Sequence, residues 1–127
     1  MSELEERAGI EPLDELLAER LALIAQVAPL RAKYGPGGLF DPLRKLEIAT
    51  ISATTRLLAA KDGVKVTEAF LDEQTHASER YAGFLAEATQ ERIRWITIEA
   101  KIDAIDARIF RGQSLARFAA AELHLQA

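Results

Sequence analysis

The spacing of apolar residues constrains this chain more than any other feature of its sequence. Leucine, isoleucine and valine recur every three or four residues, which is the period of one face of an α-helix, and sustained strand-like alternation is absent. With 127 residues, of which 49% are hydrophobic, the chain can form one core. We therefore expect an all-α fold with a single helical domain over residues 1–127, in which residues 1–11 are frayed.

Breaker residues divide this pattern into predicted helices. The first helix should begin near Pro12 and end at Gly35-Pro36-Gly37-Gly38, which is a strong turn signal. The second helix should run from Asp41 as its N-cap, with Pro42 in the first helical position, to about Ala60.

The third predicted helix begins near Val66, and Thr67 or Lys65 lies close to its cap. It contains no proline, and it either continues as one long helix or breaks around Thr89-Gln90. A stop is expected at Arg111-Gly112, with a short final helix after it. The expected architecture is therefore three long helices plus a short C-terminal helix.

Composition argues against several classes of function. A net charge of −4 and a pI of about 5.2 disfavour a broad basic surface for nucleic acid. The chain has no cysteine and its two histidines are far apart in the sequence, so we expect no metal site and no cofactor. No apolar run approaches the roughly 20 residues of a membrane span, so no membrane partner is expected.

Residues 1–12 are acidic and polar, without the basic start and apolar segment of a secretory signal. This pattern favours a cytoplasmic protein. A periplasmic or secreted location is the alternative, if a signal peptide is removed before Met1.

Two arginines stand among the apolar residues of the first predicted helix. Arg20 and Arg31 are 11 residues apart, which places them on nearly the same side as Ile24 and Val27. An unpaired charge in a core is costly, so each arginine needs a carboxylate, which it can bind through two hydrogen bonds. That carboxylate belongs either to a protein Asp or Glu or to a ligand, unless the side chains reach water along their stems.

Three other features carry less information on their own. Arg44 lies in the first turn of the second helix, where a cation opposes the helix dipole, and Asp41 is an adequate structural partner for it. Ser78 is expected in mid-helix, where serine usually bonds a carbonyl of its own helix. A further group is assigned to mixed-charge helix surface: Arg80, Arg92 and Arg94.

Four segments, in this order, resemble the all-helical chorismate mutases, and especially the longer form that is often exported. They are LAERLALIAQVAPLR at 17–31, LFDPLRKLE at 39–47, AFLDEQTHAS at 69–78 and, more weakly, KIDAIDARIF at 101–110. The resemblance implies a chorismate mutase-like helical bundle that rearranges chorismate to prephenate without a cofactor. The implied partner is a small dicarboxylate of the chorismate kind, and a homodimer is left open.

The resemblance also implies roles for individual residues. Arg20 and Arg44 would hold the carboxylates of the substrate. Arg31 stands where the family has a lysine that contacts the ether oxygen and a carboxylate, so Arg31 and Arg44 are the implied catalytic residues. Asp41 would hold a hydroxyl or orient Arg44, and Ser78 would touch a carboxylate.

The sequence departs from the family pattern within this set of positions. Lys45 stands where the family usually has Glu, and Ala82 where it has Gln or Glu as a hydrogen-bond donor to the ether oxygen. Arg31 replaces lysine, and Glu99 falls where a longer relative would offer another arginine. Loss of a transition-state donor can cost about 10²–10³ in rate.

These departures leave four hypotheses for function. The chain is a chorismate mutase, a non-catalytic relative that binds the same ligand, or a related enzyme acting on isochorismate or aminodeoxychorismate. The fourth is a helical bundle that works only through partner helices. An arginine-lined pocket is required by the first three and not by the last.

Overall fold

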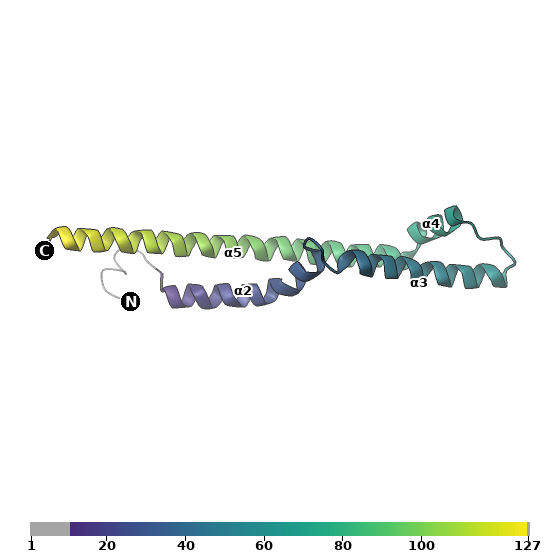
Figure 1. The fold of residues 1–127 in the computed structure, drawn as a ribbon, viewed down its shortest axis with the longest axis horizontal. Coiled ribbons are helices and arrows are strands. Elements are labelled where there is room, and N and C mark those ends of the chain that lie inside the picture. Colours follow the sequence, from purple (N-terminus) through teal and green to yellow (C-terminus); the bar gives the residue numbers. More distant parts are fainter. Residues whose placement is uncertain (1–10, 127) are drawn as a thin grey trace. The chain divides into compact units, whose positions relative to one another are not determined.

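The computed structural model describes residues 11–126, and every regular element in that range is an α-helix (Figure 1). The helices are α2 (Leu13–Tyr34), α3 (Phe40–Lys61), α4 (Glu68–Ala77) and α5 (Glu79–Gln126). The all-α prediction is confirmed. The expectation of frayed residues 1–11 falls, apart from Glu11, outside the described residues.

The chain divides into two compact units. Unit 1 combines the residues up to Pro29 with those from Trp95 onward, and unit 2 is formed by Leu30–Arg94. Both α2 and α5 contribute residues to each unit.

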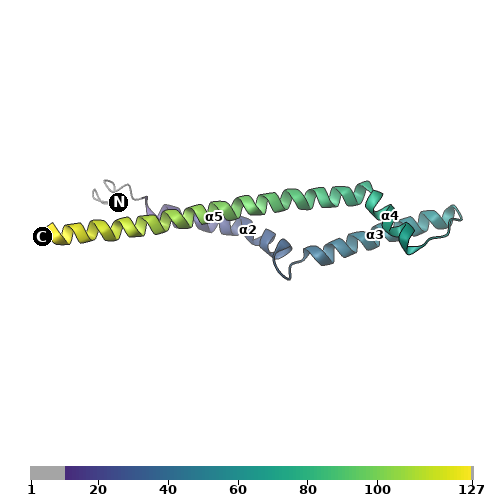
Figure 2. The same ribbon diagram turned by 90° about the horizontal axis from the view of Figure 1, so that it is seen from above.

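In unit 1, α2 packs antiparallel against the C-terminal part of α5 (Figures 1 and 2). The buried residues on both helices fall on a series of positions that alternates by three and four, as in a coiled-coil seam, although not every position of the series is buried. They are Leu16, Leu23 and Val27 on α2, and Ile98, Ile102, Ile105 and Ala119 on α5. Where unit 1 begins on α5, the indole Nε1 of Trp95 donates a hydrogen bond to Glu99 Oε1 at 3.1 Å.

In unit 2, α3 packs against α4 and against the first turns of α5. Ile51 of α3 and Leu71 of α4 are buried, and the buried hydroxyl of Thr75 donates to the carbonyl of Leu71 at 2.8 Å. Four aromatic rings form a chain of contacts beside them. The ring centroids are 5.3 Å apart for Tyr34 and Phe40, 5.7 Å for Phe40 and Phe84, and 6.3 Å for Phe84 and Tyr81.

The loops after α2 and α3 lie where the turn signals place them. Gly37 and Gly63 both adopt φ of +69°, a left-handed conformation that favours glycine. Thr67 caps α4, because its hydroxyl accepts a hydrogen bond from Phe70 N at 3.1 Å. One of the two caps expected for the third helix is thereby confirmed.

The second helix starts within one residue of its predicted start, but its predicted N-cap is wrong. The N-cap of α3 is Leu39, so Asp41 lies inside the first turn and Pro42 follows it there. Phe40 is already helical, and its ring stacks against Phe84. The tertiary contact of that ring thus favours a helix that begins at Phe40, before Asp41. Asp41 still complements the positive end of the helix dipole.

The predicted organisation of the third helix is also wrong. The chain bends at Ser78, whose backbone is extended (φ −71°, ψ 130°). The 48-residue α5 then continues through Thr89-Gln90, which matches the continuous alternative there, and also through the expected stop at Arg111-Gly112. A single glycine costs about 1 kcal/mol within a helix, and at Gly112 the buried positions of unit 1 continue to Ala119 and outweigh that cost. The separate short helix is therefore α4, which precedes the long one.

Candidate functional site

Arg20 is paired with an acid of the protein. Its Nε donates a hydrogen bond to Asp106 Oδ1 at 2.6 Å, and the two side chains are 38% and 46% exposed. Arg20 lies in the seam of unit 1 between Leu16 and Leu23, so the partner that its position demanded comes from α5. Of the alternatives for this arginine, pairing with a protein carboxylate is the one observed.

Arg31 does not share the burial of the seam. Val27 and Leu30 are buried, but Arg31 is exposed in the last turn of α2 and belongs to unit 2. The expectation of two arginines on one core-facing stripe is wrong for Arg31. The seam follows positions spaced by three and four, which include Leu30 and leave residue 31 outside.

Within the described part of the chain, three charged residues at the start of α3 have no acid or base partner. Arg44 is half-buried, whereas Asp41 and Lys45 are exposed. Within residues 11–126, none of these three side chains makes an ion pair or a hydrogen bond. The expected structural pair of Asp41 with Arg44 is therefore not formed.

Ser78 is the residue that joins α4 to α5. Its backbone N–H donates to the carbonyl of Thr75 at 3.1 Å, and its hydroxyl accepts from Tyr81 N at 3.4 Å. The expectation of a mid-helix serine is wrong, because Ser78 caps the start of α5. Ala82 lies one turn further along α5, on the same face, and its exposed methyl group offers no hydrogen bond.

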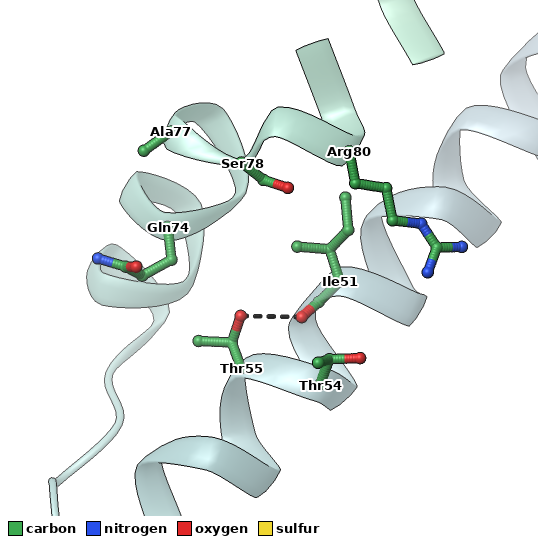
Figure 3. Close-up of a pocket in the computed structure, with 7 residues that line it drawn as sticks. All are labelled: Ile51, Thr54, Thr55, Gln74, Ala77, Ser78 and Arg80. Atoms are coloured by element: carbon green, nitrogen blue, oxygen red, sulfur yellow. Dashed lines mark hydrogen bonds between the residues drawn. The ribbon is translucent and has the colours of Figure 1, made fainter. Parts of the chain in front are cut away.

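A pocket of about 320 Å³ lies in unit 2 around Ser78 (Figure 3). We call it the serine pocket. It is lined by Ile51, Thr54 and Thr55 of α3, by Gln74 and Ala77 of α4, and by Ser78 and Arg80. The bend at Ser78 separates the end of α4 from the start of α5, so both helices present side chains toward the same part of α3.

The hydrogen bonds around the serine pocket determine what its polar groups can still do. The hydroxyls of Thr54 and Thr55 donate to the carbonyls of Thr50 and Ile51 at 3.1 and 2.9 Å, which leaves their oxygens as acceptors. The Ser78 hydroxyl already accepts a hydrogen bond, so its proton remains available for donation.

Arg80 supplies the cation of the serine pocket. Its Nε and Nη2 donate to the two carboxylate oxygens of Glu47 at 2.5 and 3.4 Å, and this hydrogen bonding raises the pKa of Arg80. The bonds to Glu47 hold the guanidinium along α3, while Nη1 keeps its donors. Ser78 and Arg80 thus contribute donors to the lining of the serine pocket, and Thr54 and Thr55 contribute acceptors.

A second pocket, of about 390 Å³, contains Asp41. We call it the glycine-loop pocket. It is lined by Lys33, Tyr34, Gly35, Pro36, Gly37, Gly38, Phe40, Asp41 and Arg92. The guanidinium carbon of Arg92 lies 4.5 Å from the ring centroid of Phe40 and 5.0 Å from that of Tyr34, within cation–π range.

The glycine-loop pocket carries little net charge. Lys33 Nζ lies 2.9 Å from Glu91 Oε1, and that hydrogen bond raises the pKa of Lys33. The negative charge of Asp41 balances the positive charge of the remaining cation, Arg92. Burial raises the pKa of Tyr34, so its phenol stays neutral beside them.

Neither pocket brings two of the predicted residues together. Ser78 lines the serine pocket and Asp41 the glycine-loop pocket, whereas neither pocket is lined by Arg31, Arg44, Lys45 or Ala82. Arg44 nevertheless shares a face of α3 with Ile51 and Thr55, because seven and eleven residues are close to whole helical turns. Arg20 belongs to unit 1.

Sequence reasoning missed several residues of these pockets. Arg80 and Arg92 were assigned to helix surface, and both are exposed, yet one contacts Glu47 and the other stacks on aromatic rings. The available signal for the serine pocket was the Thr54-Thr55 pair, because adjacent hydroxyls in mid-helix commonly bond the carbonyls one turn earlier. No sequence pattern marks Arg92.

Comparison of the chain with known family models, with curated proteins and with solved structures found no match. Residues 11–126 contain no group of three or more His, Cys, Asp or Glu side chains placed to hold a metal ion. Within the same range, no helix combines the length and the apolar character that crossing a membrane requires.

Proposed function

We propose that this chain binds a small hydroxylated dicarboxylate of the chorismate type and rearranges it to prephenate. The observation that carries the proposal is the position of Ser78. The residue that the resemblance assigns to a substrate carboxylate lines a pocket that also holds a guanidinium and two acceptor hydroxyls. Its volume of about 320 Å³ falls within the range of small-ligand pockets.

The polar groups of the serine pocket suit such a ligand. A carboxylate would accept hydrogen bonds from Ser78 and from Nη1 of Arg80. A ligand hydroxyl would donate to Thr54 or Thr55, whose own protons are committed to the helix. The second carboxylate would lie toward Arg44, two turns before Ile51 on the same face of α3.

The reaction requires little beyond this arrangement. Chorismate rearranges in one pericyclic step, which needs no nucleophile and no general acid or base. A protein accelerates it by holding the two ends of the molecule in a near-attack geometry and by stabilising charge on the breaking ether oxygen. Arg44, which has no acid partner within residues 11–126, is the cation that we assign to the ether oxygen as well as to the second carboxylate.

A second candidate function is binding of the same ligand without turnover. It is favoured by Ala82, which presents a methyl group where the family has an amide or carboxyl donor, and by Arg20, which is already paired with Asp106. A third candidate is the related reaction of isochorismate or aminodeoxychorismate, since the acceptor hydroxyls can pair with a hydroxyl or an amino group.

The test is an assay of the full chain for loss of chorismate and appearance of prephenate, with calorimetry for binding. Turnover that falls at least about 100-fold in Arg44→Ala, and is reduced in Ser78→Ala, supports the proposal. The matched control is Arg94→Ala, an exposed arginine outside both pockets, which should retain full activity.

Three other outcomes separate the candidates. Saturable binding without turnover supports the non-catalytic function. Turnover of isochorismate or aminodeoxychorismate alone supports the third candidate. A well-folded protein that neither binds nor converts any of these compounds overturns the proposal.

A further inference from the structure

The part of α5 in unit 1 has apolar residues on two opposite faces. Its inner face, which includes Ile98, Ile102 and Ile105, is buried against α2. On the outer face, Ile96, Phe110 and Phe118 are 68%, 71% and 65% exposed. A helix with apolar residues on opposite sides is typically buried on both. Among residues 11–29 and 95–126, nothing covers the outer one.

The outer face follows its own coiled-coil spacing. Starting at Ile96, positions alternate by four and three residues along about 25 residues of α5, a length of roughly 38 Å. We call these positions the outer stripe: Ile96, Ala100, Asp103, Ala107, Phe110, Ser114, Arg117 and Ala121. All eight are exposed, and Phe118 lies beside Arg117. Small residues at every seventh position would let a facing helix approach closely.

The two charges of the outer stripe determine which partner fits it. Asp103 and Arg117 lie seven residues on either side of Phe110, and within residues 11–126 neither makes an ion pair or a hydrogen bond. If two copies of α5 pack antiparallel with Phe110 on the two-fold axis, Asp103 faces the partner's Arg117, and this pair forms twice. Parallel packing would instead place Asp103 against Asp103 and Arg117 against Arg117.

We propose that the outer stripe is a homodimer interface in which two α5 helices pair antiparallel about Phe110. In the same register Ala107 lies within one residue of the level of the partner's Ser114, and Ala100 within one residue of the level of the partner's Ala121, so small residues lie between the larger layers. Such an interface is isologous and closes on itself without a leftover edge. Oppositely charged pairs fix the register and disfavour the parallel alternative.

Sedimentation equilibrium of the full chain tests the interface. We expect a species of twice the 14.0 kDa chain mass, and a shift to monomer in Phe110→Glu with helix content unchanged. Leu57→Glu is the matched control, because Leu57 is 68% exposed but lies on α3 in unit 2. A monomeric native chain overturns the proposal, as does a dimer that survives Phe110→Glu.

Charge reversal tests the register. Asp103→Arg and Arg117→Asp should each weaken the dimer about tenfold or more, because like charges then meet across the axis. The double variant should restore the native dissociation constant. Failure of that restoration overturns the assigned pairing.

Cross-linking tests the direction of the helices, since the natural chain has no cysteine. An antiparallel pair predicts a disulfide between a chain carrying Ala107→Cys and another carrying Ser114→Cys. Chains that carry Ala107→Cys alone should link poorly. Efficient linking of Ala107→Cys to itself would indicate parallel helices and overturn the proposal.

Discussion

The guanidinium of Arg20 and the carboxylate of Asp106 are joined by a 2.6 Å hydrogen bond between residues 86 positions apart in the chain. The bond ties α2 to α5 within unit 1. Since both side chains are about two-fifths exposed, water screens the pair and reduces its contribution to stability.

A double-mutant cycle with Arg20→Ala and Asp106→Ala should measure this contribution. We expect a coupling free energy of about 0.5–1 kcal/mol in urea unfolding followed by circular dichroism. A coupling near zero would mean that the pair does not form in solution. Repeating the cycle at high salt should reduce the coupling, because exposed charges are screened.

Two leucines of α2 should respond very differently to the same truncation. Leu23 is 9% exposed in the seam, whereas Leu21, on the same helix, is 69% exposed. Leu23→Ala should lower the free energy of unfolding by about 2–5 kcal/mol, while Leu21→Ala should change it by less than about 1 kcal/mol. Equal effects in thermal or urea unfolding would contradict the assignment of the seam.

Stability should fall at alkaline pH because of Lys33 and Tyr34. The hydrogen bond to Glu91 raises the pKa of Lys33, and burial raises the pKa of Tyr34. Groups with a raised folded-state pKa stabilise the fold fully below their unfolded pKa, here about 10. That stabilisation is lost as the pH rises through the folded-state values.

The measurement is the free energy of unfolding in urea at several pH values between about pH 8 and pH 11. Tyr34→Phe should make the decline above about pH 10 shallower, because it removes one titrating group, and Lys33→Met should do the same for the other. A native curve that stays flat across this range would rule out both contributions.

The proposed function predicts that restoring a donor near Ser78 raises activity. Ala82 lies in the first turn of α5, four residues after Ser78, and Ala82→Gln would place an amide at the position where the chorismate mutases that the sequence resembles have one. We expect kcat/KM for chorismate to increase by the order of 10²–10³. Ala82→Met, which has similar bulk and no N–H donor, should show no such gain. Equal rates in the two variants would argue against a missing donor.

Local sequence signals predicted the first half of the fold well. Gly35–Gly38 ends α2 and Thr67 begins α4, because glycine conformations and hydroxyl caps act within a few residues. The N-cap of α3 was missed because the stacking of Phe40 on Phe84 is a contact between distant segments. A capping rule that uses only Asp41 and Pro42 cannot take that contact into account.

The candidate site was less predictable than the helices. Spacing correctly indicated that Arg20 needs a carboxylate, but Asp106 lies 86 residues away and only the packing of α5 on α2 identifies it. Ser78 was selected by resemblance alone. Its role as a cap follows from a bend in the chain at Ser78, and no neighbouring glycine or proline indicates that bend in the sequence. Arg80 enters the serine pocket because that bend turns the start of α5 toward Glu47.

The indole of Trp95, which donates a hydrogen bond to Glu99 one turn along α5, is an intrinsic fluorescent probe of the chain. It is the only tryptophan in the sequence, so its fluorescence comes from a single place, at the boundary where unit 1 begins on α5. A change in its emission would record events there without an added label. The thermal unfolding curve from tryptophan fluorescence can be compared with the curve from circular dichroism, which reports on all the helices. Coincident midpoints would indicate that the chain unfolds in one cooperative transition.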